Sequence, residues 1–481
     1  MNGFKFDTTY TSLPSLFFKH LNPEKAPEPR LVVLNHELAA SLGLDFSGLS
    51  QKAQAEMFSG NKLPDGAEPF AQAYAGHQFG HLNILGDGRA HIWGEHITPE
   101  GKRIDIQFKG SGRTPYSRRG DGKAVLGPML REYIIAEAMH NLGIPTTRSL
   151  AVVTTGERVM REAPLPGAAL TRTADSHIRV GTFELAAIHR DVEALEKLLD
   201  YTINRHDPDL KNSSNKALDF IRAVMSRQVD LIVNWMRVGF IHGVMNTDNM
   251  AISGETIDYG PCAFMDAYDP NTVFSSIDHM GRYAYGNQPH MAQWNLARLA
   301  QALLPLIDDD IQKAVNMAED VIDEFSALYE TRWLAMMAAK IGLTTPQKGD
   351  KKLIEDLLAW MHQNGADYTN TFRALTDRHF EDEVFEDKAF KAWLKAWQER
   401  RKTDAKTEAE GQLLMAATNP AIIPRNHRVE EALEAATAGN IKPFNALVAA
   451  LKTPYENTPD LAPYQIPPAG AQRVYQTFCG T

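Results

Sequence analysis

A long helical pattern that runs into a polar loop constrains the fold of this chain more than any other feature. Apolar residues recur every three or four positions across residues 216–238, as on the buried face of an amphipathic helix. Those residues are Leu218, Ile221, Met225, Val229, Ile232 and Met236. After the polar stretch that follows, two short apolar runs flank Gly254-Glu255. The pattern predicts a buried helix that leads into a loop and then into a β-hairpin.

Two oxygen-bearing side chains converge in this predicted hairpin. If Gly254-Glu255 is a two-residue turn, Ala251 pairs with Asp258. Asn249 shares a face with Ala251 because side chains alternate along a strand, so Asn249 and Asp258 become diagonal neighbours about 5–8 Å apart. Amide and carboxylate oxygens are ligands that Mg²⁺ uses beside nucleotide phosphates. We therefore expect a metal site here, with ordinary loop polarity as the alternative.

The same stretch resembles the catalytic segment of protein kinases, His-x-Asp-x-x-x-x-Asn followed by Asp-Phe-Gly. His242 and Asn249 have the kinase spacing, and residues 258–260 read Asp-Tyr-Gly. The position of the kinase catalytic aspartate is occupied by Val244, which cannot accept a proton. Either the protein binds nucleotide without catalysis, or another base serves, and Asp248 is the candidate.

Length and composition bound the class of protein. A chain of 481 residues exceeds the single-core limit of about 250–300, so at least two lobes or domains are expected. The formal net charge of −10 argues against a general nucleic-acid binder. The N-terminus lacks the apolar core of a signal peptide, and no apolar run reaches the length of a membrane span. We expect a cytoplasmic protein without nucleic-acid or membrane partners.

Two motifs in the first part of the chain are typical of phosphate handling. Residues 82–95 predict two short strands around Gly86-Asp-Gly-Arg89, where glycine lets backbone N–H groups approach a phosphate and arginine adds charge. A plain hairpin turn is the alternative. Residues 103–108 alternate as a strand that ends in Lys109, as in the kinase strand whose lysine holds the phosphates. A solvated lysine at the end of a strand is the alternative.

A glycine- and arginine-rich stretch, residues 110–123, precedes a predicted helix between Leu126 and Leu142. Its spacing differs from that of a Walker A loop, yet it is typical of a loop that handles anions. Glu132 lies on the flank of the helix, where it could pair with Lys109 as in kinases. A solvated surface glutamate is the alternative.

Two arginines further along the chain suit the outer oxygens of a triphosphate. A strand and hairpin are predicted near residues 149–157. Beyond them, Arg172 and Arg179 are seven positions apart and would share one face if the segment is helical. Paired guanidinium groups bind phosphate oxygens well. Exposed surface arginines are an equally acceptable interpretation of this spacing.

Five motifs together resemble the selenoprotein O family, the bacterial YdiU-type protein adenylyltransferases. They occupy residues 86–89, 107–122, 242–249, 258–261 and 419–426, in the family's order. The resemblance implies an α+β fold with two protein-kinase-like lobes and a helical C-terminal extension. It implies an N-terminal extension over 1–70, a kinase-like N-lobe over 71–165, and a helical C-lobe with the catalytic hairpin and the extension over 166–481.

The resemblance also implies roles for individual residues. Asp248 matches the proton acceptor, Asn249 and Asp258 match the metal ligands, and Glu132 matches the glutamate that pairs with the lysine. The positions that match nucleotide contacts are Gly86, Gly88, Arg89, Lys109, Asp121, Gly122, Arg172, Arg179 and Asp258.

The implied activity is transfer of AMP from ATP to Ser, Thr or Tyr hydroxyls of proteins. ATP would lie reversed relative to ordinary kinases, so that its α-phosphate faces the acceptor. The resemblance suggests UTP as a second donor and Mg²⁺ or Mn²⁺ as the cofactor. A conventional protein kinase and an inactive nucleotide-binding pseudokinase are the alternatives.

Two cysteines, Cys262 and Cys479, are too few for a disulfide framework or a cysteine-built zinc site. Selenoprotein members of the family end in a cysteine and a selenocysteine separated by two residues. Cys479 stands in the place of the selenocysteine, and Gln476 stands where the cysteine would be. Cysteine count and analogy with the family raise the hypothesis of a disulfide between Cys262 and Cys479, with two free thiols as the alternative.

Overall fold

One antiparallel sheet forms the first part of the protein in the structure, a computed structural model that describes residues 3–477. Within this range nine strands join in the order β1-β3-β5-β6-β9-β8-β2, while β4 pairs with β3 and β7 pairs with β9. The strands are β1 (Phe18–His20), β2 (Arg30–Leu34), β3 (Phe70–Gln78), β4 (His81–Gly86), β5 (Ala90–Ile97), β6 (Arg103–Lys109), β7 (Ala124–Val125), β8 (Arg148–Met160) and β9 (Pro164–Ala174).

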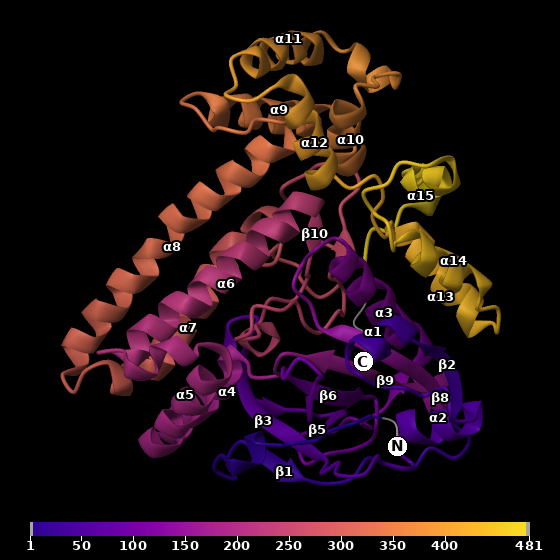
Figure 1. The fold of residues 1–481 in the computed structure, drawn as a ribbon, viewed down its shortest axis with the longest axis vertical. Helices are drawn as coiled ribbons and strands as arrows, with labels where there is room; N and C mark the ends of the chain where they lie inside the picture. Colours follow the sequence, from indigo (N-terminus) through magenta and orange to yellow (C-terminus); the bar gives the residue numbers. More distant parts are fainter. Residues whose placement is uncertain (1–2, 478–481) are drawn as a thin grey trace.

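Helices make up most of the remaining described chain. They are α1 (His36–Ser41), α2 (Gln51–Phe58), α3 (Leu126–Asn141), α4 (Val180–His189), α5 (Val192–His206), α6 (Lys216–Val238), α7 (Gln288–Ile307), α8 (Ile311–Lys340), α9 (Asp350–Asn364), α10 (Tyr368–Asp377), α11 (Lys388–Lys402), α12 (Glu408–Thr418), α13 (Asn426–Thr437), α14 (Lys442–Ala450) and α15 (Ala462–Gln465). The sheet lies at one end of the molecule, and α9–α12 lie at the other (Figure 1). The expected mixed fold with many helices is therefore present.

The two faces of β6 explain how the sheet presents polar groups to the helical half. Ile104, Ile106 and Phe108 alternate along the strand and pack into a cluster with residues of α1 and α2. Gln107 and Lys109 occupy the intervening positions and are also buried. Because successive side chains point to opposite faces, these two polar groups face away from that cluster, where α3 packs against β8 and β9.

Helix α6 has the bounds that its apolar periodicity predicts. The Asn215 side chain accepts a hydrogen bond from the backbone of Leu218 and so caps the first turn. Gly239 ends the helix in a left-handed conformation, with φ of 74°. The chain then enters β10 (Phe240–Ile241), which pairs with β11 (Ala263–Phe264). Both ends of the loop between these strands are thus held at the end of a buried helix.

The prediction of a β-hairpin around Gly254-Glu255 is wrong. Gly254 N donates to Ala251 O at 3.1 Å, which closes a turn earlier in the chain than expected. The flanking residues pair elsewhere: Thr256 forms a bridge with Thr146, and Ala251 forms one with Arg179. Segments distant in sequence supply the hydrogen bonds that a local hairpin would have made, and local sequence patterns do not show them.

The sheet uses residues from both sides of the expected domain boundaries. Strands β1 and β2 come from residues 1–70, and β9 crosses the boundary at 165/166. One sheet thus contains residues of all three expected parts, and the division of the chain into an N-terminal extension, an N-lobe and a C-lobe stays a prediction.

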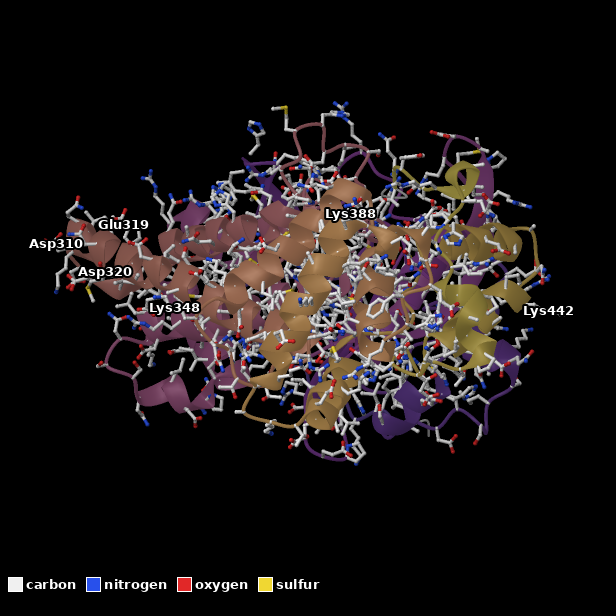
Figure 2. The ribbon with its side chains drawn as sticks, turned by 90° about the horizontal axis from the view of Figure 1, so that it is seen from above. Asp310, Glu319, Asp320, Lys348, Lys388 and Lys442 are labelled. Carbon is white, nitrogen blue, oxygen red and sulfur yellow. The ribbon has the colours of Figure 1, made fainter. Side chains whose placement is uncertain are left out.

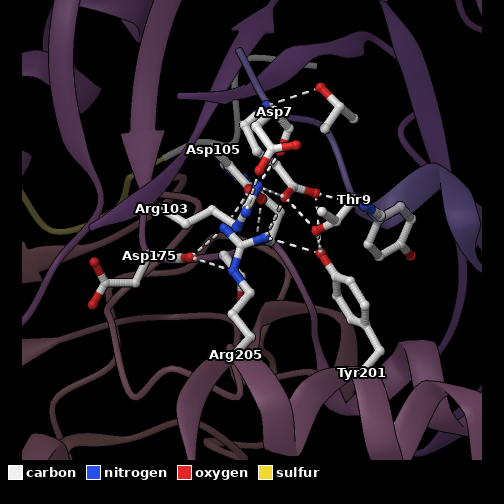
Figure 3. A network of polar contacts seen from close by, with 12 residues as sticks. Asp7, Thr9, Arg103, Asp105, Asp175, Tyr201 and Arg205 are labelled. Carbon is white, nitrogen blue, oxygen red and sulfur yellow. Dashed lines mark hydrogen bonds and ion pairs between the residues drawn. The ribbon is translucent and has the colours of Figure 1, made fainter. Parts of the chain in front are cut away.

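A polar network joins the N-terminal segment, the sheet and α5 (Figure 3). Arg205 on α5 contacts Asp105 on β6 at 2.6 Å and donates to the Asp175 carbonyl at 2.6 Å. Arg103, also on β6, contacts Asp7 at 2.7 Å. Because residue 175 lies between β9 and α4, this network pins the connection between the sheet and the following helices.

Charged side chains lie on the outer surface of the helical half. Asp310, Glu319 and Asp320 lie on the projecting end of α8, and Lys442 lies on the opposite side of the molecule (Figure 2). Among residues 3–477, no helix combines the length and apolar character that are needed to cross a bilayer.

Arg425, immediately before α13, ties the C-terminal helices to the middle of the chain. Its guanidinium is 1% exposed and contacts Asp266 at 2.6 Å and Asp367 at 2.5 Å. The next residue, Asn426, exchanges two hydrogen bonds with the backbone of Phe264 in β11. The motif at 419–426 therefore anchors the extension beside the loop that contains Asp258.

Replacement of Arg425 by methionine should lower the free energy of unfolding by about 3–5 kcal/mol, because a buried cation is lost and two partly buried carboxylates are left without it. Denaturant unfolding followed by circular dichroism measures the change. The control is Arg428→Met in the first turn of α13, where the side chain is 30% exposed, pairs with Glu431 and donates to the Pro463 carbonyl. This control substitution should change the free energy of unfolding by no more than about 0.5 kcal/mol. Equal effects of the two substitutions would contradict the anchoring role.

Candidate active site

A cavity of about 940 Å³ is lined by residues of both the sheet and the helical half. Twelve positions expected to bind nucleotide or metal, to accept a proton or to support the lysine lie on its wall. These are Gly86, Gly88, Arg89, Lys109, Asp121, Gly122, Glu132, Arg172, Arg179, Asp248, Asn249 and Asp258. The structure thus brings residues spread over more than a third of the chain into one cavity.

Asp258 is the centre of the charged groups in this cavity. Its Oδ1 contacts Lys109 Nζ at 2.8 Å and Arg172 Nη1 at 2.7 Å. Its Oδ2 contacts Arg179 Nη1 at 2.8 Å. The three cations come from β6, from β9 and from the residue that precedes α4. One carboxylate therefore joins the sheet to the helical half.

Glu132 completes the charge balance on the α3 side. Its Oε2 contacts Lys109 Nζ at 2.6 Å, and its Oε1 contacts Arg172 Nη1 at 2.9 Å. Gln107 fixes the other end of the Arg172 guanidinium by accepting a hydrogen bond from Nε at 2.7 Å. Glu132 and Arg172 are each 2% exposed, so this pairing is shielded from solvent.

Arg179 contacts residues that the sequence motifs did not single out. Its guanidinium lies over the Tyr74 ring, 4.5 Å from the centroid, and Nη2 is 3.8 Å from Asp87 Oδ1. Nη1 also donates to the Asp248 carbonyl at 2.6 Å. Burial raises the pKa of Asp87, and the Arg179 charge opposes that rise. Asp87 stands between the two glycines of the Gly86–Arg89 motif, and this position was the only indication in the sequence that Asp87 belongs to the site.

The expectations for the arginine pair are corrected by these positions. Arg172 lies in β9, and Arg179 precedes α4, so the two do not share a helix face. Neither is a surface residue, because each is 2% exposed. Their guanidinium groups meet through tertiary packing around Asp258, and spacing along the chain does not reveal such a meeting.

The electrostatics keep Asp258 ionised. Burial would raise the pKa of its carboxyl, but Arg172, Lys109 and Arg179 outweigh that effect and hold the pKa well below its ordinary value. The backbone of Asp258 is left-handed, with φ of 62°. Such a conformation costs of order 1 kcal/mol or more for a residue other than glycine, and it clusters at functional sites. The three ion pairs compensate for this strain.

Asp248 lies nearby with a different environment. Its side chain is largely buried, and its Oδ1 has no hydrogen-bond partner within residues 3–477. Gln78 Nε2 is 3.5 Å from Oδ2. Burial raises the pKa of Asp248 to about 6, against the lowering effect of Arg179. The unpartnered Oδ1 is itself buried against Gly76, while the residue as a whole lines the cavity, and a carboxylate at such a place is suited to accept a proton.

Asn249 and Asp258 offer the oxygen ligands that a hard divalent cation prefers. Asn249 Nδ2 donates to Val244 O at 3.0 Å, so the amide oxygen is the atom not committed to this bond. A carboxylate has about four lone-pair sites. The three cations occupy three of them on Asp258, and one remains on Oδ2. These residues therefore fit Mg²⁺ or Mn²⁺. No cluster of three or more His, Cys, Asp or Glu residues suited to a metal occurs in the described chain.

The glycine-rich loops are shaped by their contacts with each other. A Cβ at Gly86 would lie 2.4 Å from the Tyr116 ring, and one at Gly122 would lie 2.3 Å from the Gly112 carbonyl. Glycine is required there because two chain segments approach closely. Asp121 is held by Arg161, whose Nη1 lies 2.7 Å away, and this hydrogen bond lowers the pKa of Asp121.

The expected disulfide falls partly outside the described residues, because Cys479 lies beyond residue 477. Cys262 is buried at 1% exposure, four residues after Asp258. Thr477 Oγ1 donates to the Pro261 carbonyl at 2.6 Å, which brings the end of the described chain next to Cys262. The pairing stays a prediction.

Comparison with known proteins identifies the family of this chain. Residues 1–452 match the family described as Protein adenylyltransferase SelO. The chain belongs to this family. It is 58% identical over its full length to the Protein nucleotidyltransferase YdiU of Nitrosococcus oceani and covers 98% of that protein. The YdiU proteins of Bacillus cytotoxicus and Brevibacillus brevis are 57% and 58% identical with the same coverage. The chain is therefore a nucleotidyltransferase.

Arg179→Met should weaken nucleotide binding at least about tenfold, because it removes a buried cation that faces Asp258 and the cavity. Fluorescence titration with a labelled ATP analogue measures the dissociation constant. Arg222→Met on α6 is the matched control, since Arg222 is 44% exposed and pairs only with surface carboxylates. Unchanged binding in Arg179→Met would contradict the placement of phosphate beside Arg179.

Proposed function

We propose that this protein transfers AMP from ATP to Ser, Thr or Tyr hydroxyls of other proteins, with UTP as a second donor. The names of the family and of its relatives support a protein nucleotidyltransferase. The observation that carries the proposal is the group of three buried cations around Asp258, in the cavity that also contains Asp248. The proposal assigns the departing diphosphate to the cations and the acceptor proton to Asp248.

The chemistry follows from this assignment. The acceptor oxygen attacks the α-phosphorus, a new oxygen–phosphorus bond forms, and the bond between the α-phosphorus and the bridging oxygen breaks. Pyrophosphate leaves with the electron pair, so negative charge grows where Lys109, Arg172 and Arg179 can stabilise it. The acceptor proton moves to Asp248, which is mainly ionised at neutral pH because its pKa is about 6. A divalent ion held by Asn249 and Asp258 would add positive charge to the phosphates.

A kinase-like arrangement is part of the proposal. The strands succeed one another as β3-β5-β6-β9-β8 in an antiparallel sheet, and α3 brings Glu132 to the lysine at the end of β6. Protein kinases use such a lysine–glutamate pair from a strand and a helix. Val244 at the position of the kinase base favours Asp248 as its replacement.

Labelled ATP tests the reaction directly. Incubation with a bacterial protein extract and Mg²⁺ or Mn²⁺ should place the label in protein when the α-phosphate is radioactive and should place none there when the γ-phosphate is. Label from the γ position alone would show a phosphoryl-transferring kinase. Label from neither position would contradict transfer to protein and leave a nucleotide-binding role.

Asp258→Asn should reduce transfer at least about 100-fold, because it removes a metal ligand and the anion that holds three cations together. AMP incorporation at saturating ATP measures the effect, and the same assay over a range of Mn²⁺ concentrations reports the loss of metal affinity. Asp121→Asn, at a more exposed carboxylate in the glycine-rich loop that also lines the cavity, should lose less activity. Full activity of Asp258→Asn would overturn the assignment.

A further inference from the structure

Glu184 joins three elements behind the candidate proton acceptor. It lies on α4 and is 4% exposed. Its Oε2 accepts a hydrogen bond from Thr247 Oγ1 at 2.6 Å, and its Oε1 lies 2.5 Å from His77 Nδ1. The backbone N–H of His77 in β3 donates to Thr247 Oγ1 at 2.7 Å. Helix α4, strand β3 and the loop before Asp248 are therefore closed into one ring of hydrogen bonds.

This ring sets the position of Asp248 beneath β3. Asp248 follows Thr247 directly, and Gly76 precedes His77. A Cβ on Gly76 would lie 2.3 Å from Asp248 Oδ1, so the strand and the carboxylate are already in close contact. A second bond, from Phe79 N to Asn246 Oδ1 at 3.1 Å, holds the end of β3 to the same loop.

From these contacts we infer that Glu184 is a positioning residue for transfer: it fixes Thr247, and through Thr247 it fixes Asp248. The inference rests on the proposed role of Asp248. Glu184 lines a second cavity together with His77 and does not line the cavity around Asp258, so it acts on transfer through Thr247 and not by contact with phosphate. A fully buried threonine hydroxyl with both a donor and an acceptor partner leaves the loop little freedom.

The decisive substitution is Thr247→Val, which keeps the shape of the side chain and removes the hydroxyl. The turnover number for AMP transfer should fall about 10- to 100-fold, since a displacement of about 1 Å can cost that much. The KM for ATP should change less than about twofold, because the ion pairs of the three cations with Asp258 do not involve Thr247. Thr247→Ser should restore most of the turnover, because the hydroxyl returns.

The control is Thr202→Val on α5. Thr202 is also fully buried, and its hydroxyl bonds only within its own helix, to Leu198 O at 2.7 Å. It should keep the turnover number of the unmodified protein. Glu184→Gln provides a second route to the same loop, and it should also lower turnover without raising the KM for ATP. If Thr247→Val does not fold, the turnover number of Glu184→Gln decides whether Glu184 positions the loop.

The outcomes separate this inference from the proposed function. Thr247→Val with unchanged turnover, or with a loss equal to that of Thr202→Val, overturns the positioning role. Asp248→Asn measured beside them tests the base: full activity there overturns the role of Asp248. An inactive Asp248→Asn together with a fully active Thr247→Val and Glu184→Gln overturns the positioning role alone.

Discussion

The contact of one partly buried carboxylate, Asp258, with three buried cations is the interaction on which the site depends. A buried charge without a partner costs several kcal/mol, so these groups can be buried only together. The charges balance: three cations face three carboxylates, which are Lys109, Arg172 and Arg179 against Asp258, Glu132 and Asp87. Since these residues come from separate strands, helices and loops, formation of the cluster fixes how the sheet meets the helical half.

The rest of the fold holds the cluster in place from behind. Arg172 and Arg179 flank the connection between β9 and α4, and that connection is pinned on both sides. Arg205 binds the carbonyl of residue 175, while Asp105 accepts the backbone N–H of His177 at 2.8 Å. The polar network around Arg205 and Asp105 (Figure 3) therefore restrains both arginines, Arg172 and Arg179, that line the cavity.

Local patterns in the sequence predicted the helices and strands that are determined by residues close together in the chain. The alternation of residues 103–108 gave the strand that ends in Lys109, and the periodicity of residues 216–238 gave α6 with its bounds. The expected contact between Lys109 and Glu132 is present in the structure. Each of these features depends on residues close in sequence or on one contact between two well-marked elements.

Features that depend on distant partners were misjudged or missed. The hairpin around residue 254 failed because Pro145 and Ile178 supply the backbone partners for its strands. The arginine spacing would have placed both side chains on one face only if the segment were helical, whereas β-pairing with Gln107 places Arg172 in the sheet. Tyr74 lies in no motif, and the motifs that contain Asp87 and Thr247 do not show which residues these two side chains contact. Their roles exist only once the sheet, α4 and the loop before Asp248 have met.

The charges of the cluster balance, and its three cations have N–H groups that Asp258 and Glu132 do not use. Each arginine commits one terminal nitrogen, Nη1, to Asp258, and a guanidinium has five N–H groups in all. Lys109 uses two of its three donors on Glu132 and Asp258. In the proposed reaction, a triphosphate would use the uncommitted donors and leave the ion pairs that hold the site together intact. The donors are already oriented, so little reorganisation is needed as charge develops on the leaving diphosphate, and preorganisation of this kind is what makes electrostatic stabilisation effective in catalysis.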